Sequence, residues 1–188
     1  MSYQKKDGDF SIQNFEKFGV PVLKKIFGVD AQIFITESRT TDDAPSLEKA
    51  LDFAGIDGVI VGYDGLTYFY ASRVQRGKCY ESFSLRGYRP SGAITEFVKL
   101  QHASKINAPM PTYHIQIFVA DDEQSATVGF ARTIDLLRYC ERQNPETKTT
   151  ATGERFFVIP WTELEKVKIF SVDACGLVEE INIRRRVA

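Results

Sequence analysis

The central part of the chain alternates apolar and polar positions in a way that predicts paired strands. Residues 56–62 form a mainly apolar run, and residues 66–75 form a second run that is rich in aromatic side chains. Asp64-Gly65 separates the two runs, and an Asp-Gly pair in this setting is a strong hairpin signal. Residues 80–86 alternate large apolar with polar side chains and predict a third strand. We therefore expect the first two strands to pair as an antiparallel hairpin.

Apolar residues at helical spacing predict helices on both sides of this hairpin. Residues 12–27 place Phe15, Phe18 and Val22 on one stripe, and Pro21 inside the run predicts a kink. Further helices are expected at 46–53, 94–106 and 132–142, and further strands at 31–36, 112–120, 125–130, 154–159 and 168–172.

These elements predict the fold class and the domain organisation. Helices interspersed with strands are typical of an α/β domain, here of the α+β type, with a central mixed sheet and flanking helices. No repeat or domain boundary interrupts the pattern, so residues 1–188 are expected to form a single domain. The two ends, residues 1–9 and 176–188, are expected to be loose tails.

The composition limits the classes of protein to which the chain can belong. Of the 188 residues, 43% are hydrophobic and 26% are charged, and the formal net charge is −1. The chain can bury a sizeable core but cannot coat nucleic acid by charge alone. Its three cysteines match neither a zinc spacing nor a secreted disulfide framework. There is no signal-peptide pattern and no apolar run that could span a bilayer, so we expect a cytoplasmic protein without a membrane contact.

Polar side chains mark the ends of the predicted hairpin strands. Asp57 lies near the start of the first strand, and Arg73 and Gln75 lie near the end of the second. Alternation places Arg73 and Gln75 on the same face. We expect Asp57, Arg73 and Gln75 to converge on one cleft. The alternative is structural, with Asp57 capping the turn at Gly55 and forming a salt bridge with Arg73 inside an ordinary sheet.

This arrangement resembles the core of the PD-(D/E)XK nuclease superfamily, which has a restriction-endonuclease-like fold. In that pattern an aspartate, often preceded by Gly-Ile, begins a strand, and the next strand carries acid-x-lysine after a hairpin. Gly55-Ile56-Asp57 matches the first half, whereas Arg73 at the lysine position places Ala71 where the acid belongs. A weaker similarity, to uncharacterised proteins of phages and mobile elements, assigns no activity. It rests on Gly55-Ile56-Asp57, on residues 72–75 and on Pro160-Trp161-x-x-Leu164.

The resemblance implies a Mg²⁺ ion bound by Asp57, with Glu16 of the first predicted helix as a carboxylate that faces the metal. Glu37 or Gln75 could supply a further ligand oxygen, since Mg²⁺ takes oxygen ligands. The metal would activate a bound water beside a phosphate. Arg73 stays protonated and cannot act as a base, but its planar fork can hold a phosphate. A solvated surface charge is the alternative interpretation of Glu16.

Further arginines extend this candidate site towards nucleic acid. Arg86 and Arg89 lie in a basic, aromatic segment, residues 86–92, that is suited to gripping phosphate and stacking on a base, or is an ordinary turn. Arg132 begins a predicted helix and could contact a phosphate. Two functions stay open. One is a protein that binds DNA or RNA and, if catalytic, is a Mg²⁺-dependent nuclease. The other is a non-enzymatic phage or mobile-element protein that binds a host protein on a nuclease-like scaffold.

Overall fold

The hairpin that the Asp-Gly pair predicts is present. Strands β2 (Gly58–Val61) and β3 (Thr67–Arg76) pair antiparallel, with Val61 opposite Thr67. Gly65 has a φ of 74°, which glycine adopts without steric cost, and Leu66 N donates to Asp64 Oδ1 at 3.0 Å. The computed structural model describes residues 3–36, 50–51 and 54–182. The helix expected at 46–53 therefore lies mostly outside the described residues.

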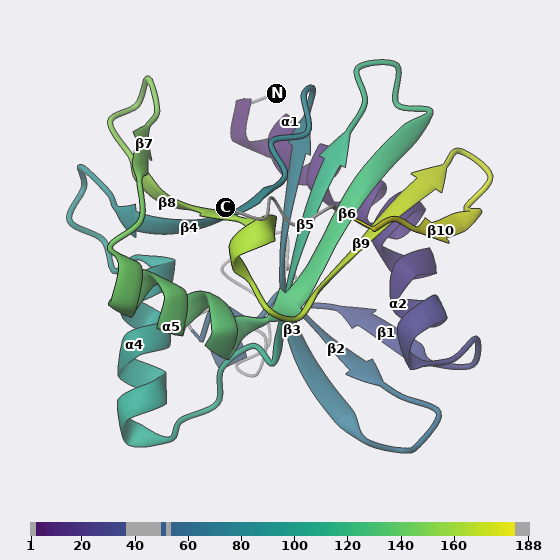
Figure 1. Cartoon of the computed structure of the whole chain (residues 1–188), viewed down its shortest axis with the longest axis horizontal. Coiled ribbons are helices and arrows are strands. Elements are labelled where there is room, and N and C mark those ends of the chain that lie inside the picture. Colours follow the sequence, from purple (N-terminus) through teal and green to yellow (C-terminus); the bar gives the residue numbers. More distant parts are fainter. Residues whose placement is uncertain (1–2, 37–49, 52–53, 183–188) are drawn as a thin grey trace.

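The hairpin belongs to a large, curled sheet of mixed strand direction that gives the chain an α+β fold (Figure 1). Its strands follow the order β1-β2-β3-β5-β6-β9-β10, in which β3 and β5 run parallel and the other neighbours run antiparallel. The strands not yet introduced are β1 (Gln32–Ile35), β5 (Tyr113–Val119), β6 (Ser125–Arg132), β9 (Val167–Asp173) and β10 (Val178–Glu180).

A small second sheet is the main departure from the expected architecture. It consists of β4 (Ser82–Tyr88), β8 (Arg155–Pro160) and β7 (Thr147–Thr149) in the order β4-β8-β7. The expected third strand thus forms, but it leaves the hairpin and pairs with β8. Alternation along a strand fixes which side chains share a face and says nothing of which strand becomes the neighbour.

One helical segment covers the first face of the large sheet. It runs through α1 (Tyr3–Asn14), the π-helical turn η1 (Phe15–Gly19) and α2 (Val20–Phe27). The expectation of a loose tail is wrong for residues 3–9, which are helical, and for residues 178–180, which form β10. Pro21, where a kink was expected, follows the π-helical turn η1. It lies in the first turn of α2, where its missing N–H is tolerated.

The apolar core on this face joins the helical segment to the sheet. Phe15, Phe18 and Leu23 pack against Tyr70, Ile117 and other buried side chains of the strands. Phe15 stacks on Tyr70 with ring centroids 5.1 Å apart.

The opposite face of the large sheet is covered by the small sheet together with two helices (Figure 1). These are α4 (Glu96–Ile106) and α5 (Thr133–Gln143), and the short 3₁₀ turn η2 (Trp161–Glu163) follows β8. Trp161 is fully buried against β6, where a Cβ on Gly129 would lie 2.6 Å from the indole ring. Among the described residues, no helix has the length and apolar character that crossing a membrane requires.

Candidate functional site at the junction of the two sheets

Arg73 and Gln75 point to the side of the large sheet on which the small sheet packs. The parallel register of β3 and β5 places Arg73 beside Gln116 and Gln75 beside Phe118. Phe118 belongs to the apolar core shared with the small sheet, whereas Val74 packs on the helix-covered side. Because successive side chains of a strand point to opposite faces, Arg73, Gln75 and Gln116 share the face towards the small sheet.

Gln116 ties the two sheets together. Its side chain is 2% exposed, and its Nε2 donates to Gln75 Oε1 at 3.1 Å and to the backbone oxygen of Arg73 at 3.4 Å. Its Oε1 accepts a hydrogen bond from Ser84 Oγ of β4 at 3.1 Å. A buried amide whose donor and acceptor are both satisfied orients its partners, because leaving either group unpaired would cost desolvation energy.

A second buried polar group, formed by His114, Glu96 and Thr133, lies beside Gln116. His114 is 4% exposed; its Nε2 lies 2.6 Å from Glu96 Oε1, and its Nδ1 lies 3.1 Å from Thr133 Oγ1. The other oxygen of Glu96 accepts a hydrogen bond from Arg86 N at 3.2 Å. Glu96 therefore joins α4 to β4 and β5, and it fixes the backbone at Arg86.

The guanidinium groups of Arg73 and Arg86 lie against one aromatic ring. Arg73 Cζ lies 4.0 Å from the centroid of the Phe156 ring, and Arg86 Cζ lies 5.2 Å from it. Phe156 is on β8, directly opposite Arg86 in the register of the small sheet. Its ring is 6% exposed. The cation–π contacts with this ring offset part of the repulsion between the two guanidinium groups.

Two of the arginines at this point share a single carboxylate. Arg86 Nε and Arg89 Nε lie 3.3 Å and 3.5 Å from the same oxygen, Glu154 Oε1. Within the described residues, Arg73 forms no ion pair; burial lowers its pKa, and the charges of Glu96 and Glu154 oppose that shift. Arg86 and Arg89 thus share one carboxylate, Glu154, whereas Glu96 pairs with His114. An anion that approached Arg73 would find a cation whose charge is only partly compensated.

Asp57 lies beside this group and makes a different contact from the expected ones. Its Oδ2 accepts a hydrogen bond from Ser72 N at 2.6 Å, and its own N–H donates to Tyr70 O at 2.9 Å. The contacts fasten Asp57 to β3 one residue before Arg73. Asp57 and Arg73 do not form the salt bridge that the structural alternative required.

Two other predicted site residues lie away from Arg73. Glu16 is exposed on η1, which packs on the opposite face of the sheet from Arg73. Arg132 is opposite Tyr113, whose ring packs on that same helix-covered side, and it donates to both oxygens of Asp135 at 2.8 and 2.7 Å. The hydrogen bonds to Asp135 raise the pKa of Arg132. Glu37 lies outside the described residues.

The described carboxylates at the junction do not make a Mg²⁺ site. Asp57 already holds the β3 backbone through Oδ2, and both oxygens of Glu96 are engaged by His114 and Arg86. Ala71, on the strand beside Asp57, offers no oxygen from its side chain. Among the described residues, no three or more His, Cys, Asp or Glu side chains form a group that could hold a metal ion. No reaction step through Mg²⁺ follows from this set of donors.

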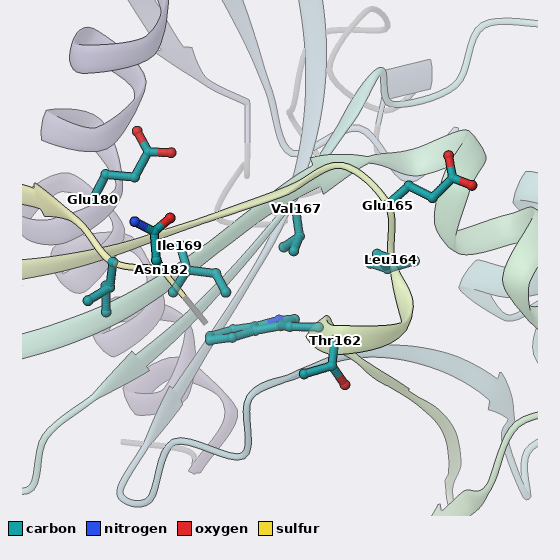
Figure 2. A pocket seen from close by; sticks show the side chains of 9 residues that line it. Thr162, Leu164, Glu165, Val167, Ile169, Glu180 and Asn182 are labelled. Atoms are coloured by element: carbon teal, nitrogen blue, oxygen red, sulfur yellow. The ribbon is translucent and has the colours of Figure 1, made fainter. Parts of the chain in front are cut away.

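A small pocket of about 110 Å³ lies elsewhere, where β9 begins (Figure 2). Figure 2 shows Leu164, Val167 and Ile169 along its wall, with Glu180 and Asn182 from the segment around β10. Trp161 also lines it, and the indole Nε1 has no hydrogen-bond partner among the described residues. None of the residues predicted from the sequence as a site lines this pocket.

Sequence reasoning missed several residues of the junction. The strand expected at 112–120 is present as β5, which is buried on both faces, and its His114 pairs with Glu96. The sequence pattern predicts only a strand around Glu154 and Phe156. The alternation of His114 and Gln116 with apolar residues was the available signal, since a polar side chain on a buried strand requires a partner.

Comparisons with known proteins assign no function to the chain, so a function is argued from the junction of the two sheets. No family model matches the chain, and neither the curated proteins nor the solved structures contain a match.

Proposed function

We propose that this protein binds nucleic acid through phosphate contacts at Arg73, Arg86 and Arg89. The observation that carries the proposal is the state of Arg73. Its guanidinium is stacked on Phe156, burial lowers its pKa, and it has no carboxylate partner within ion-pair distance among the described residues. A guanidinium presents donors in a planar fork that matches phosphate geometry. A phosphate would compensate the charge that Glu96 and Glu154 leave unpaired.

Support for a scaffold like that of the PD-(D/E)XK nucleases comes from the order of the elements. The Gly55-Ile56-Asp57 turn precedes β2, the hairpin follows, and β3 carries Arg73 where the resemblance places a lysine. The resemblance weakens at Ala71 and at Glu16, which supply no second carboxylate. The proposal is therefore binding, and cleavage would require ligands beyond those that the described residues provide.

The binding proposal is tested by salt titration with matched variants. Short DNA and RNA oligonucleotides should bind with an affinity that falls as salt rises, because each phosphate contact releases counterions. Arg73→Met should weaken binding. It should also reduce the slope of log affinity against log salt concentration by the amount that corresponds to about one phosphate contact. Arg73→Lys should recover only part of the affinity, since it keeps the charge and loses the fork. Arg76→Met is the matched control, because Arg76 lies on the same strand, is exposed and pairs with Glu123.

Two results would contradict the proposal: equal affinity of the wild type and Arg73→Met, or no binding to either nucleic acid at low salt. A second function, binding of a host protein without catalysis, is favoured by Ala71, which stands where the resemblance expects an acid. Co-purification followed by mass spectrometry separates the two. Recovery of a stoichiometric protein, with no nucleic acid, would favour this second function.

A further inference from the structure

The face of the small sheet that carries Arg86 and Phe156 also carries a lysine, Lys148. Phe156 is opposite Arg86 on one side and opposite Lys148 of β7 on the other. Residues opposite each other in an antiparallel pair point to the same face, so Arg86, Phe156 and Lys148 form a row across three strands. Adjacent strands are about 4.8 Å apart, which places the Cα atoms of Arg86 and Lys148 about 10 Å apart.

Tyr80 lies at the end of this row and is accessible. The residue is 57% exposed, and Lys148 Nζ lies 5.0 Å from the ring centroid. Tyr80 also packs edge-on against Phe118, with centroids 6.0 Å apart, and Phe118 is beside Gln75 in the β3–β5 register. The ring therefore contacts Phe118 and Lys148, while more than half of the surface of Tyr80 remains exposed.

These residues give the junction cations, an exposed aromatic residue and a side-chain amide. Arg73, Arg86 and Lys148 supply positive charge, Tyr80 supplies the exposed ring, and Gln75 supplies a side-chain amide. Sites for single-stranded nucleic acid combine cations that follow the phosphates with aromatic rings on which bases stack. In a duplex, the base faces are covered by neighbouring base pairs, so an exposed tyrosine gains little from it.

We propose that the junction binds one unpaired strand of DNA or RNA, with a base stacked on Tyr80 and the flanking phosphates on Lys148 and on the pair Arg73–Arg86. This assignment rests on the proposed nucleic-acid binding and adds the class of substrate and the residue that selects it. The near-neutral charge of the whole chain, −1, fits a ligand recognised by stacking as well as by charge.

The experiment measures the affinity of the full chain for three labelled probes of equal length: a single-stranded oligothymidine, the same backbone with abasic sites, and a duplex. The wild type should prefer the oligothymidine to both other probes. Tyr80→Ala should weaken oligothymidine binding by about tenfold and leave the affinity for the abasic strand unchanged. Tyr80→Phe should keep the wild-type affinity, because it keeps the ring.

Matched controls separate stacking from general effects of mutation. Tyr63→Ala removes a tyrosine that is 79% exposed on the β2–β3 turn, and it should bind like the wild type. Lys148→Ala should weaken the binding of all three probes. Lys24 is an exposed lysine of α2 on the other side of the large sheet, and Lys24→Ala should leave binding unchanged. The melting temperature of each variant shows whether it is folded, and the comparison of probes on the wild type requires no variant.

The outcomes distinguish this inference from the function on which it rests. Two results would overturn the stacking site and leave phosphate binding intact. One is equal affinity of the wild type for the oligothymidine and the abasic strand. The other is a Tyr80→Ala variant that binds the oligothymidine as tightly as the wild type does. A duplex that binds as tightly as the single strand would also overturn it. Absence of binding to all three probes, or tighter binding to an acidic polypeptide, would remove the nucleic-acid proposal itself.

Discussion

The two faces of the large sheet are covered in chemically different ways, and β5 shows the difference along a single strand. Ile115, Ile117 and Val119 point to the helical segment and lie in an apolar core. His114 and Gln116 point to the small sheet and to α4, where both are buried in polar contacts. The first face gains stability from apolar area removed from water. The second face combines an apolar core around Trp161 with these buried polar side chains.

The buried polar groups of the second face indicate where a functional site lies in this fold. A buried polar group is costly unless all of its partners are in place, so such groups persist where they orient something else. On the second face they fix Arg86, through Glu96, and the strand carrying Arg73, through Gln116. The helix-covered face needs no such explanation, since its side chains follow from packing alone.

The largest expected effect tests the helix-covered face. Phe18 is fully buried between η1 and the sheet, and Phe18→Ala should destabilise the protein by about 3–5 kcal/mol, through lost apolar burial and the cavity left behind. Chemical denaturation measures the free energy of unfolding. Phe34→Ala is the matched control, because Phe34 is 51% exposed on β1 and should cost about 1 kcal/mol or less. Equal costs of the two variants would mean that this face does not dominate stability.

An intermediate effect tests the polar network of the other face. Glu96→Ala removes the acceptor of Arg86 N and the partner of His114 Nε2, so it should cost about 1–3 kcal/mol. It should also weaken nucleic-acid binding, because the backbone at Arg86 loses its anchor. Glu179→Ala on β10 removes an exposed carboxylate and should change stability by no more than about 0.5 kcal/mol. Similar values for both variants would show that the network is not required for folding.

Local pattern was sufficient for much of this fold. The Asp64-Gly65 turn, the pairing of β2 with β3, and the helices near 94–106 and 132–142 were predictable, because each depends on residues close in sequence. The strand that pairs with β4 was not predictable, because the alternation of apolar and polar residues in β4 is compatible with a place in either sheet. The π-helical turn before Pro21 also leaves no distinct mark in the spacing of apolar residues.

The site was predictable only in part, for a related reason. Alternation placed Arg73 and Gln75 on one face, and the structure shows their shared partner, Gln116. Glu96 and His114 are 18 positions apart, and Arg73 and Phe156 are 83 positions apart, so no spacing rule links them. The resemblance to a nuclease pattern led to Glu16 as a ligand, whereas the helix that carries it packs on the other face.

The smallest effect compares Arg73 with Arg76, two arginines on opposite faces of β3. Arg76 stacks on Phe10, with Cζ 4.7 Å from the ring centroid, and pairs with Glu123; the two side chains are 55% and 43% exposed. Exposed ion pairs contribute little, so Arg76→Met should change the free energy of unfolding by less than about 1 kcal/mol. Arg73→Met should also lie within about 1 kcal/mol of the wild type, and on the stabilising side, because it removes a cation whose burial is not compensated by an ion pair.

The pair separates a binding role of Arg73 from a structural one. Arg73→Met should lose nucleic-acid affinity without losing stability, and Arg76→Met should lose neither, as measured by denaturation and binding on the same preparations. A residue that evolved to stabilise the sheet would show the reverse, with a stability loss that exceeds that of Arg76→Met by several-fold. In that case the cation on Phe156 would be a structural element, and weakened binding by the variant would reflect unfolding. Stability that holds while affinity falls is the signature of a charge retained for a ligand, since proteins tolerate such local cost where function requires it.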